Sequence, residues 1–337
     1  MNNNCCFVSV VIPTRNCREY LYRCLKAIRQ SDYHDFEVIV VDDASEDEFP
    51  EVVRSYIDRV IILRKRVGPG KARNIAAQQA RGEIVFFIDS DVEIKLNTLT
   101  KAVEFLKEHT DIAALFGSYD SNPDCLNFFS QYKNLFHYFV HQNSNPEAKT
   151  FWSGCGAIRK DVFLEIGGFP EKNINAMIED VELGHKLISK NYKIRLIKEL
   201  QVKHLKRWDL VSLIKTDIFS RIIPWTRLAF KSGLPYDLNF KVKDRISGVL
   251  SLLIPFSLLF FFYSKLFLFF SMLLLTIFIY LNRSLCKFFM HKMGFSFSVG
   301  AIFFNWFYFF YSSIVFCCYS LILLVRNLCR IKESELI

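Results

Sequence analysis

The N-terminal third of the chain alternates between two hydrophobic patterns. Short runs rich in β-branched and aromatic residues predict strands at residues 7–12, 36–42, 59–63 and 84–89. Segments with helical spacing predict helices at residues 18–30, 47–57, 71–80 and 96–108. Most of the strand runs are continuously apolar, as strands buried on both faces are. The alternation therefore predicts a Rossmann-like α/β fold, in which helices cover both faces of a mainly parallel sheet.

The middle of the chain carries less regular patterns. Residues 151–158 predict a strand interrupted by glycines, and residues 178–190 predict a helix that begins with acidic residues. Residues 208–230 have apolar positions at helical spacing, with Lys215, Arg221 and Arg227 on the polar side. That pattern is typical of a helix lying in the plane of a membrane surface. A helix packed on the preceding domain is the alternative, and Pro224 predicts a bend or break in either case.

Charged residues almost disappear after Arg245. Residues 246–264, 266–281 and 299–325 hold no Asp, Glu, Lys or Arg. A helix needs about 20 apolar residues to cross the hydrocarbon core of a bilayer. A buried helix of a soluble protein rarely stays apolar on every face for so long. We therefore expect two to three C-terminal transmembrane helices.

Positive charge is concentrated just before these apolar runs. The formal net charge of the whole chain is +9, and residues 203–245 hold ten Lys or Arg against four Asp, an excess of six. Cationic flanks mark the cytoplasmic side of a membrane. The sequence therefore predicts a multi-pass membrane protein whose first domain is cytoplasmic. The apolar runs that follow disfavour nucleic acid as the partner of this basic segment.

The number of spans depends on how the last apolar run is placed. Cations at residues 283–292 belong on the cytoplasmic side, which makes residues 246–281 a hairpin of two spans. A third span would then carry Arg326 and the cations after it to the opposite side, against that tendency. Either this charge rule is broken or one run is re-entrant, and Pro255 in the first run favours a re-entrant segment.

These patterns predict four segments. We expect a cytosolic catalytic domain at residues 1–200, a basic amphipathic interfacial segment at 201–245, a transmembrane region at 246–325 and a polar tail at 326–337. The first six residues lack the basic and apolar regions of a signal peptide. The ten cysteines form no Cys-x-x-Cys pair, so neither a zinc site nor a disulfide scaffold is indicated. Assembly as a homo-oligomer is compatible with the sequence.

Two of the predicted strands end in acidic clusters, Asp42-Asp43 and Asp89-Ser90-Asp91. In open α/β sheets, ligands bind beyond the carboxyl ends of the strands, so these side chains should converge on one crevice. Acids at one strand end could also cap the following helix, which would explain the residues after Asp43. Helix capping does not explain why the pattern recurs after Ile88.

Five motifs in order make the chain similar to the family 2 glycosyltransferases of GT-A fold. The resemblance covers about residues 7–230, and any one motif alone would be a weak signal. The motifs are Val10-Val11-Ile12-Pro13-Thr14-Arg15-Asn16, Val41-Asp42-Asp43-Ala44-Ser45, Gly70-Lys71-Ala72-Arg73-Asn74, Asp89-Ser90-Asp91 and Glu179-Asp180.

The resemblance implies a nucleotide-sugar site with a divalent cation, Mg²⁺ or Mn²⁺. Hard cations prefer carboxylate oxygens and bridge to phosphate. Asp91 would hold the metal, and Asp89 would contact the ribose or a metal-bound water beside Ser90. Asp43, with Asp42, would bind the base. Five further residues are expected along the same pocket: Pro13, Thr14, Arg15, Gly70 and Arg73, with Lys71 adding a cation.

The acceptor side is implied by later motifs. Asp180 matches the base that deprotonates an attacking hydroxyl, and Glu179 would orient it. Acids in a first helical turn are also ordinary partners of the helix dipole, which is the structural alternative. Trp152, Gly154, Arg207 and Trp208 are expected to line the acceptor side. His204 is a candidate ligand of the metal or the diphosphate, or else an interface histidine.

The resemblance therefore implies an inverting, metal-dependent transferase that moves a sugar from a UDP- or GDP-linked donor. The acceptor would be a hydroxyl of a lipid or lipid-linked saccharide at the cytosolic membrane face. A polyprenyl-phosphate acceptor is the alternative. Because that acceptor is already an anion and needs no base, Asp180 argues against it. A nucleotidyltransferase is disfavoured because residues 10–16 contain no glycine, and an inactive scaffold because Asp89, Asp91 and Asp180 are all present.

Overall fold

The structure is a computed structural model that describes residues 6–46, 51–171, 178–232 and 241–334. The chain forms two compact units, Met1–Asp209 and Leu210–Ile337. The division expected from the sequence, with boundaries after residues 200, 245 and 325, stays a prediction.

Four parallel strands form the first half of the sheet in unit 1. They are neighbours in the order β3-β2-β1-β4. Each lies within two residues of an apolar run that predicted it. Their bounds are β1 (Val8–Thr14), β2 (Phe36–Asp42), β3 (Arg59–Ile62) and β4 (Ile84–Ile88).

The second half of the sheet is mixed. It continues in the order β8-β6-β9-β5, with β7 also paired to β9. β8 (Cys155–Arg159) runs antiparallel to both β4 and β6, whereas β6 and β9 are parallel to each other. β8 begins later than the strand predicted at residues 151–158. Four strands were not predicted: β5 (Val92–Glu93), β6 (Ile112–Tyr119), β7 (Glu147–Ala148) and β9 (Lys193–His204).

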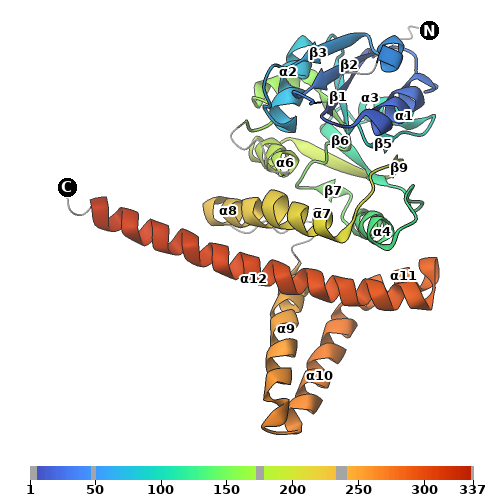
Figure 1. The fold of residues 1–337 in the computed structure, drawn as a ribbon. Helices are drawn as coiled ribbons and strands as arrows, with labels where there is room; N and C mark the ends of the chain where they lie inside the picture. The colour runs from blue at the N-terminus through green and yellow to red at the C-terminus, as the bar shows by residue number, and fades with distance from the viewer. Residues whose placement is uncertain (1–5, 47–50, 172–177, 233–240, 335–337) are drawn as a thin grey trace. The chain divides into compact units, whose positions relative to one another are not determined.

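Helices cover both faces of this sheet (Figure 1). α1 (Arg18–Arg29) and α3 (Thr98–Glu108) contribute buried side chains to one apolar cluster. α2 (Pro69–Gln79), α5 (Lys160–Glu165) and α6 (Glu179–Ser189) contribute to a second. The helices at residues 18–30, 71–80 and 96–108 confirm the predicted periodicities. The helix predicted at residues 47–57 is instead a short 3₁₀ helix, η1 (Glu51–Tyr56), and residues 47–50 lie outside the described residues. α4 (Phe128–Gln142) adds a helix that was not predicted in full.

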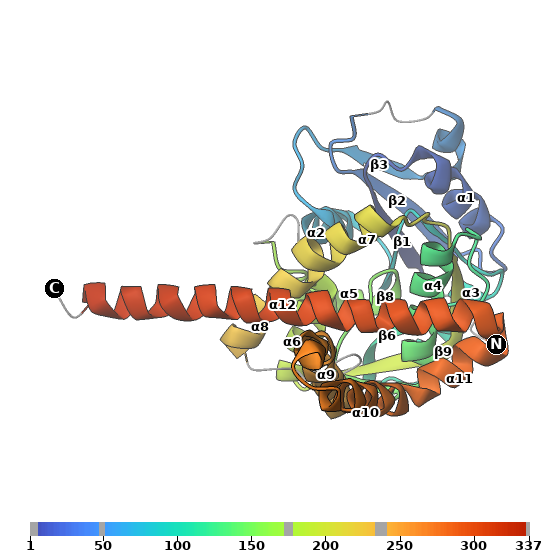
Figure 2. The same cartoon turned by 60° about the horizontal axis from the view of Figure 1, so that its bottom comes forward.

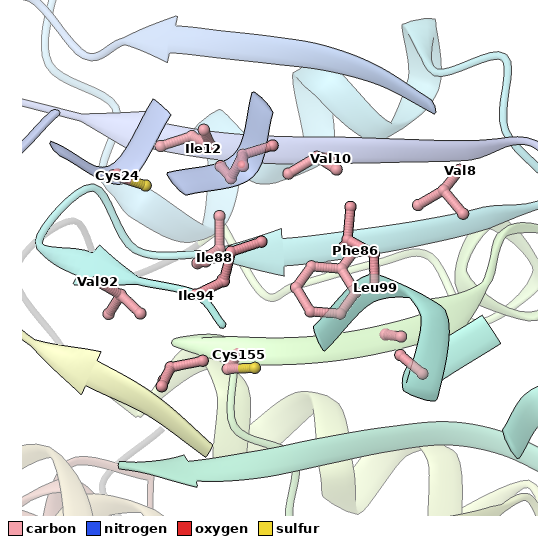
Figure 3. Packing of buried hydrophobic residues seen from close by; sticks show 14 of the residues in the cluster. Val8, Val10, Ile12, Cys24, Phe86, Ile88, Val92, Ile94, Leu99 and Cys155 are labelled. Carbon is pink, nitrogen blue, oxygen red and sulfur yellow. The ribbon is translucent and has the colours of Figure 1, made fainter. Parts of the chain in front are cut away.

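The side chains of β1 show how one strand serves both clusters. Val10 and Ile12 pack in the first cluster, and Val11 between them packs in the second. Successive side chains of a strand point to opposite faces, so a strand covered on both sides is apolar throughout. Figure 3 shows Val10 and Ile12 beside Phe86 and Ile88 of β4. Burying each such side chain stabilises the fold by roughly 1.5–3 kcal/mol, and this core fixes the strand ends that carry the site.

Unit 2 begins with the amphipathic segment. α7 (Leu210–Lys215), a π-helical stretch η2 (Thr216–Ile222) and α8 (Ile223–Ser232) follow one another without a break. The sequence predicted a bend or break at Pro224. In the structure the backbone changes from π-helical to α-helical geometry at Ile223, one residue before that proline. A wider π turn can accommodate the ring and the missing N–H of proline.

The remaining helices of unit 2 are apolar. α9 (Val242–Leu259), a short η3 (Phe260–Phe262) and α10 (Leu266–Leu281) form a hairpin, followed by α11 (Arg283–Met293) and the long α12 (Phe295–Ser334) (Figure 2). Two helices, Val242–Phe262 and Phe295–Arg326, are long and apolar enough to cross a membrane. α10 and α11 pass the same test together but are bent by 70°. By length and composition, the described helices therefore offer two to three spans, as predicted.

Candidate active site

The carboxyl ends of β1, β2 and β4 meet at one edge of the sheet. Thr14 and Asp42 are register partners at the ends of β1 and β2, and Asp89 follows the last residue of β4. All three strands are parallel, so their ends face the same way. The structure thus confirms that the two acidic clusters lie at the same edge, as in ligand sites of open α/β sheets.

The two acids after β2 are bound by the protein's own backbone. Asp43 is 4% exposed, and its two oxygens accept hydrogen bonds from the N–H groups of Val67 (2.6 Å) and Gly68 (2.8 Å). Gly68 has a φ of 89°, a conformation that favours glycine, and it precedes the first turn of α2. Asp42 accepts from the N–H of Ser45 (3.0 Å). These carboxylates therefore hold the turn after β2 against the start of α2.

The turn after β1 is joined to the turn after β2. Asn16 donates its N–H to Ser45 Oγ (3.1 Å) and accepts from the N–H of Glu46 (2.9 Å). Pro13 and Thr14 are buried, and their expected place along the nucleotide pocket stays a prediction. Arg15 is half-buried and pairs with the exposed Glu46 at 3.3 Å. Its Nε has no hydrogen-bond partner among the described residues.

Arg73 joins β4 to α6. Its side chain is buried, with Nη2 donating to Asp89 Oδ1 (2.6 Å) and Nη1 donating to Glu179 Oε1 (3.0 Å). Gly70, one turn earlier in α2, makes room: a Cβ there would lie 3.3 Å from Cβ and Cγ of Glu179. Lys71 points elsewhere and pairs with Glu171 at 2.8 Å, both side chains being more than 40% exposed. Arg73, expected beside the nucleotide, is thus held between two carboxylates.

Asp180 lies next to this arginine at the start of α6. Its Oδ1 accepts the N–H of Val181 (2.8 Å). Burial, and then the negative charge of Glu179, raise the pKa of Asp180 to about 7. Three carboxylates therefore surround one guanidinium: Asp89, Glu179 and Asp180. Glu179 Oε2 is buried without a hydrogen-bond partner among the described residues, so it is available to accept one. We call these four residues the Arg73 cluster.

Asp91 is brought to His204 by a short strand pairing. Val92 of β5 is the register partner of His204 at the end of β9, and Asp91 O accepts the N–H of Leu205 (2.8 Å). His204 Nε2 lies 3.8 Å from Asp91 Oδ2, and its ring stacks on Tyr119 with centroids 4.3 Å apart. Burial alone would raise the pKa of Asp91, but His204 and Lys206 outweigh it and lower that pKa.

The residues around Asp91 fit a hard divalent cation only with help from a substrate. No group of three His, Cys, Asp or Glu side chains in the described part of the chain is arranged to hold a metal. Asp91 and His204 offer two donors, while Asp89 is engaged by Arg73. Mg²⁺ is commonly held by one or two carboxylates plus substrate phosphates. The donor set is therefore consistent with a metal that binds together with a diphosphate.

Trp152 and Gly154 form a packed corner before β8. A Cβ on Gly154 would lie 2.5 Å from the Trp152 indole, so the ring can lie over this position only because it is glycine. The indole meets the rings of Tyr119 (4.8 Å) and His141 (5.2 Å) edge-on. Residues 151–154 are shaped by this packing, which explains why β8 begins only at Cys155. The partly exposed indole remains a candidate contact for an acceptor.

Trp208 is more enclosed than the sequence suggested. Trp208 is 4% exposed, its backbone N–H donates to Ser130 Oγ of α4 (2.7 Å), and Lys206 Nζ lies 4.2 Å from its ring centre. Arg207 beside it is exposed. Both were expected on the acceptor side. The contacts of Trp208 anchor the segment after β9 to α4 and leave Arg207 as the accessible member of the pair.

Two residues to which the sequence assigned no role support the site: Tyr119, and Asn74 at the end of the third motif. Tyr119, at the end of β6, stacks on His204 and meets Trp152 edge-on, and so connects these two candidate site residues. Its signal was a further apolar run ending before an acid, Asp120. Asn74 exchanges two hydrogen bonds of 2.9 Å with the backbone of Phe169 and fixes the loop after α5. Nothing in its spacing marked this role.

The family model of glycosyl transferase family 2 matches residues 9–167, a range that runs from the second residue of β1 to beyond β8. Residues 9–167 are a glycosyl transferase family 2 domain. The recognition made from the five motifs is thereby confirmed, although Glu179 and Asp180 lie beyond the matched range.

Relatives of this family 2 domain are found among bacterial enzymes. The poly(ribitol-phosphate) β-N-acetylglucosaminyltransferase of Staphylococcus aureus is 39% identical over 108 residues, which cover 30% of this chain and 19% of that protein. The O-antigen chain rhamnosyltransferase of Salmonella typhimurium is 27% identical over 263 residues, 72% of this chain and 81% of that protein. The chain thus spans only a fifth of the first of these relatives.

Solved structures confirm the GT-A fold. The mannosyltransferase of Pyrobaculum calidifontis, in complex with GDP-mannose and Mn²⁺, superposes with a TM-score of 0.53 at 22% identity and covers 69% of this chain and 67% of that one. GalNAc-T7, with UDP, GalNAc and Mn²⁺, gives a TM-score of 0.50 at 18% identity over 70% of this chain and 52% of that one. At these identities the likeness concerns the fold.

Proposed function

We propose that this family 2 protein is an inverting, metal-dependent glycosyltransferase. It would move a sugar from a UDP- or GDP-linked donor to a hydroxyl group of a lipid or lipid-linked saccharide. The observation that supports this most is the Arg73 cluster, in which a carboxylate with a pKa of about 7 lies beside buried acids at the sheet edge. A general base works best when its pKa lies near the pH of the reaction.

The donor would be held by the strand ends. The turns after β1 and β2, fixed by Asn16 and Asp43, present backbone and Arg15 to the nucleotide. Asp91 and His204 would hold a divalent cation, which when bound stabilises the negative charge of the departing diphosphate. Mn²⁺ and a nucleotide or nucleotide sugar occur together in both structural neighbours, which supports this assignment. Asp89, fixed by Arg73, would contact the ribose.

Asp180 would carry the proton transfer. It takes the proton of the acceptor hydroxyl while that oxygen bonds to the anomeric carbon. The bond from the anomeric carbon to the diphosphate breaks, and its electron pair leaves with the diphosphate. Attack opposite the leaving group inverts the anomeric centre. Glu179 Oε2, a buried acceptor without a partner among the described residues, would orient the incoming hydroxyl.

A phosphate acceptor, such as a polyprenyl phosphate, is the second candidate for the same site. It needs no general base, so the raised pKa of Asp180 would have no purpose in that reaction. The names of the two relatives refer to a poly(ribitol-phosphate) and an O-antigen chain, which also favours a saccharide or polyol hydroxyl. The cationic residues before α9 support a cytosolic location for unit 1, and both reactions would then take place at that face of the membrane.

The proposal is tested with membranes that contain the full chain and a panel of radiolabelled nucleotide sugars. We expect one donor to label the lipid or polymer fraction with the wild-type protein, and no label with Asp91→Ala. Asp111→Ala is the matched control, because Asp111 is an exposed acid paired with Lys193 at the start of β6. Equal labelling by wild type and Asp91→Ala would refute the metal assignment, and no labelling with any donor would refute the activity.

A further inference from the structure

Helix α12 is too long for a simple span. Its apolar part, Phe295–Arg326, has 32 residues. At about 1.5 Å per residue it would measure about 48 Å, whereas the hydrocarbon core of a bilayer is about 30 Å thick. A steep tilt would be one solution, and a position in the membrane plane is another. The contacts of α12 within unit 2 distinguish the two.

The charged helix α7–α8 lies alongside the middle of α12. Tyr311 donates its hydroxyl to Asp217 Oδ2 (2.9 Å), and Asp217 also accepts from Arg221 at 3.2 Å. Further along, Arg227 Nη2 donates to the hydroxyl of Tyr319 (2.6 Å). The contacts advance in the same direction on both helices, from Asp217 to Arg227 and from Tyr311 to Tyr319. The two helices therefore run side by side.

A membrane-spanning α12 would carry these charges into lipid. Tyr311 lies 16 residues from Phe295 and 15 from Arg326, so it is the midpoint of the apolar part. Asp217, which is 2% exposed and bonded to Tyr311, would then lie at the bilayer centre with Arg221. Ionisable groups at that depth cost several kcal/mol. At the membrane surface Arg221, whose side chain is 28% exposed, can reach water, and the cost of placing this pair at the bilayer centre is avoided.

The polar aromatic residues of α12 point to the same placement. Tyrosine and tryptophan collect at the two ends of a span, at the depth of the lipid headgroups. In α12 they lie between residues 306 and 319, so residues 295–305 and 320–326 contain none. They are Trp306, Tyr308, Tyr311 and Tyr319. A helix at headgroup depth along its whole length explains this distribution.

In the contacts that the structure describes, the α9–α10 hairpin meets α12 from its open end as far as an apolar cluster, against which Trp306 and Phe309 pack. The cluster consists of Leu250, Ile254, Leu274 and Phe278. Asn282 contacts Asn305 (3.4 Å), the rings of Phe278 and Phe309 lie 5.9 Å apart, and a Cβ on Gly248 would lie 2.8 Å from Ser313 Oγ. Nearer the tip, the two arms are joined to each other by Ser257 and Ser271. Figure 1 shows α12 crossing the open end of the hairpin rather than lying along it.

We propose that α12 lies in the plane of the membrane surface beside α7–α8, and that the α9–α10 hairpin is the element that enters the lipid. Lys241 and Lys243 before the hairpin, the cations of α11, and Arg326 then all remain on one side. This satisfies the positive-inside tendency that a third span would break. The partner of this surface is a lipid bilayer. The inference rests on the membrane attachment proposed above but not on the transfer reaction.

The test uses the full chain with a reporter fused after Ile337. An alkaline-extraction experiment first establishes that the protein is integral to the membrane, independently of sugar transfer. We expect a C-terminal fluorescent protein to fluoresce and a C-terminal periplasmic phosphatase to be inactive. An active phosphatase would show that α12 crosses the membrane and would overturn the proposal, and so would complete release of the protein by alkali.

A second measurement excludes the arrangement in which α9 and α12 alone cross the membrane. That arrangement also leaves the C-terminus inside, but it places α11 outside. A protease recognition sequence inserted after Gly294 of the full chain distinguishes the two. We expect cleavage only when the protease is on the cytoplasmic side. Cleavage from the opposite side would overturn the proposal, whatever the C-terminal reporter shows.

Discussion

The turn after β2 and the Arg73 cluster are both acidic, but their carboxylates differ in their hydrogen-bond partners. Asp43 uses both oxygens to hold backbone N–H groups of Val67 and Gly68. In the Arg73 cluster, Glu179 keeps a buried oxygen without a partner among the described residues, and the pKa of Asp180 is raised to about 7. Both oxygens of Asp43 have hydrogen-bond donors within the protein. In the Arg73 cluster, Glu179 can still accept a hydrogen bond and Asp180 can still bind a proton.

The difference suggests that Asp43 fixes the shape of the site, whereas the Arg73 cluster takes part in the proposed reaction. A carboxylate whose oxygens are satisfied by backbone fixes a loop and leaves the pocket wall to backbone atoms. A carboxylate crowded by two others around one guanidinium has a raised proton affinity and can exchange a proton near neutral pH. Mutations in the two regions should therefore change different quantities, namely donor binding in one case and the rate of the chemical step in the other.

The largest expected effect is on turnover in Asp180→Asn. Removing the base should lower kcat by about 100- to 10,000-fold with little change in donor KM. Glu182→Gln, in the same helical turn, is the control and should stay near wild type. Steady-state kinetics with the labelled donor measure both. A drop in donor affinity of the same size as the drop in kcat would place Asp180 in the donor site instead.

The same variant has a defined effect on stability. Because the folded protein raises the pKa of Asp180 above its unfolded value, stability is highest below the unfolded pKa and is lost as pH rises through about 7. Asp180→Asn should thus melt at a higher temperature than wild type in alkaline buffer, and the difference should shrink in acid. A lower melting temperature in alkaline buffer would mean that the raised pKa is wrong.

The next largest effect is expected for Arg73→Met. It leaves Asp89 and Glu179 buried without their cation, which costs about 3–5 kcal/mol of the free energy of unfolding. Lys71→Ala is the matched control, since its pair with Glu171 is exposed and contributes about 0–1 kcal/mol. Denaturant unfolding of unit 1 in the detergent-solubilised protein compares them. Equal losses would show that the cluster is not held together by Arg73.

The smallest effect is expected for Asp43→Asn. An amide can accept only one of the two N–H groups, so one charge-assisted hydrogen bond, worth about 1.5–3 kcal/mol, is lost. We expect donor KM to rise several-fold while kcat stays nearly unchanged. Isothermal titration with the nucleoside diphosphate provides an independent measure. A kcat defect with normal donor binding would erase the distinction between the two regions.

The part of the fold that could be predicted from sequence is the part built from local periodicity. The apolar runs of β1 to β4 and the helices between them are contiguous patterns, and each reappears in the structure. β5 is two residues long and β7 likewise, too short for any period to register. β6 was missed although its residues form a mostly apolar run, whereas β9 carries several charged residues and is defined by its long-range pairing with β6.

The site followed the same division. Asp89, Asp91 and Asp180 were identifiable because each belongs to a short motif at a strand or helix end. The contact between His204 and Asp91 depends on β5 pairing with the end of β9, and the use of Arg73 as a bridge depends on where α6 packs. Motifs name the reactive groups, but only the tertiary structure shows which of them share a partner.

The most direct measurement of the central claim is the pH dependence of kcat/KM for transfer to a hydroxyl acceptor. If Asp180 is the base, the wild-type value rises about tenfold per pH unit in acid and levels off near the Asp180 pKa of about 7. Asp180→Asn, measured in parallel, loses this rise, while Glu182→Gln keeps it. A wild-type profile that is flat through this range, or one that Asp180→Asn reproduces unchanged, would contradict the account.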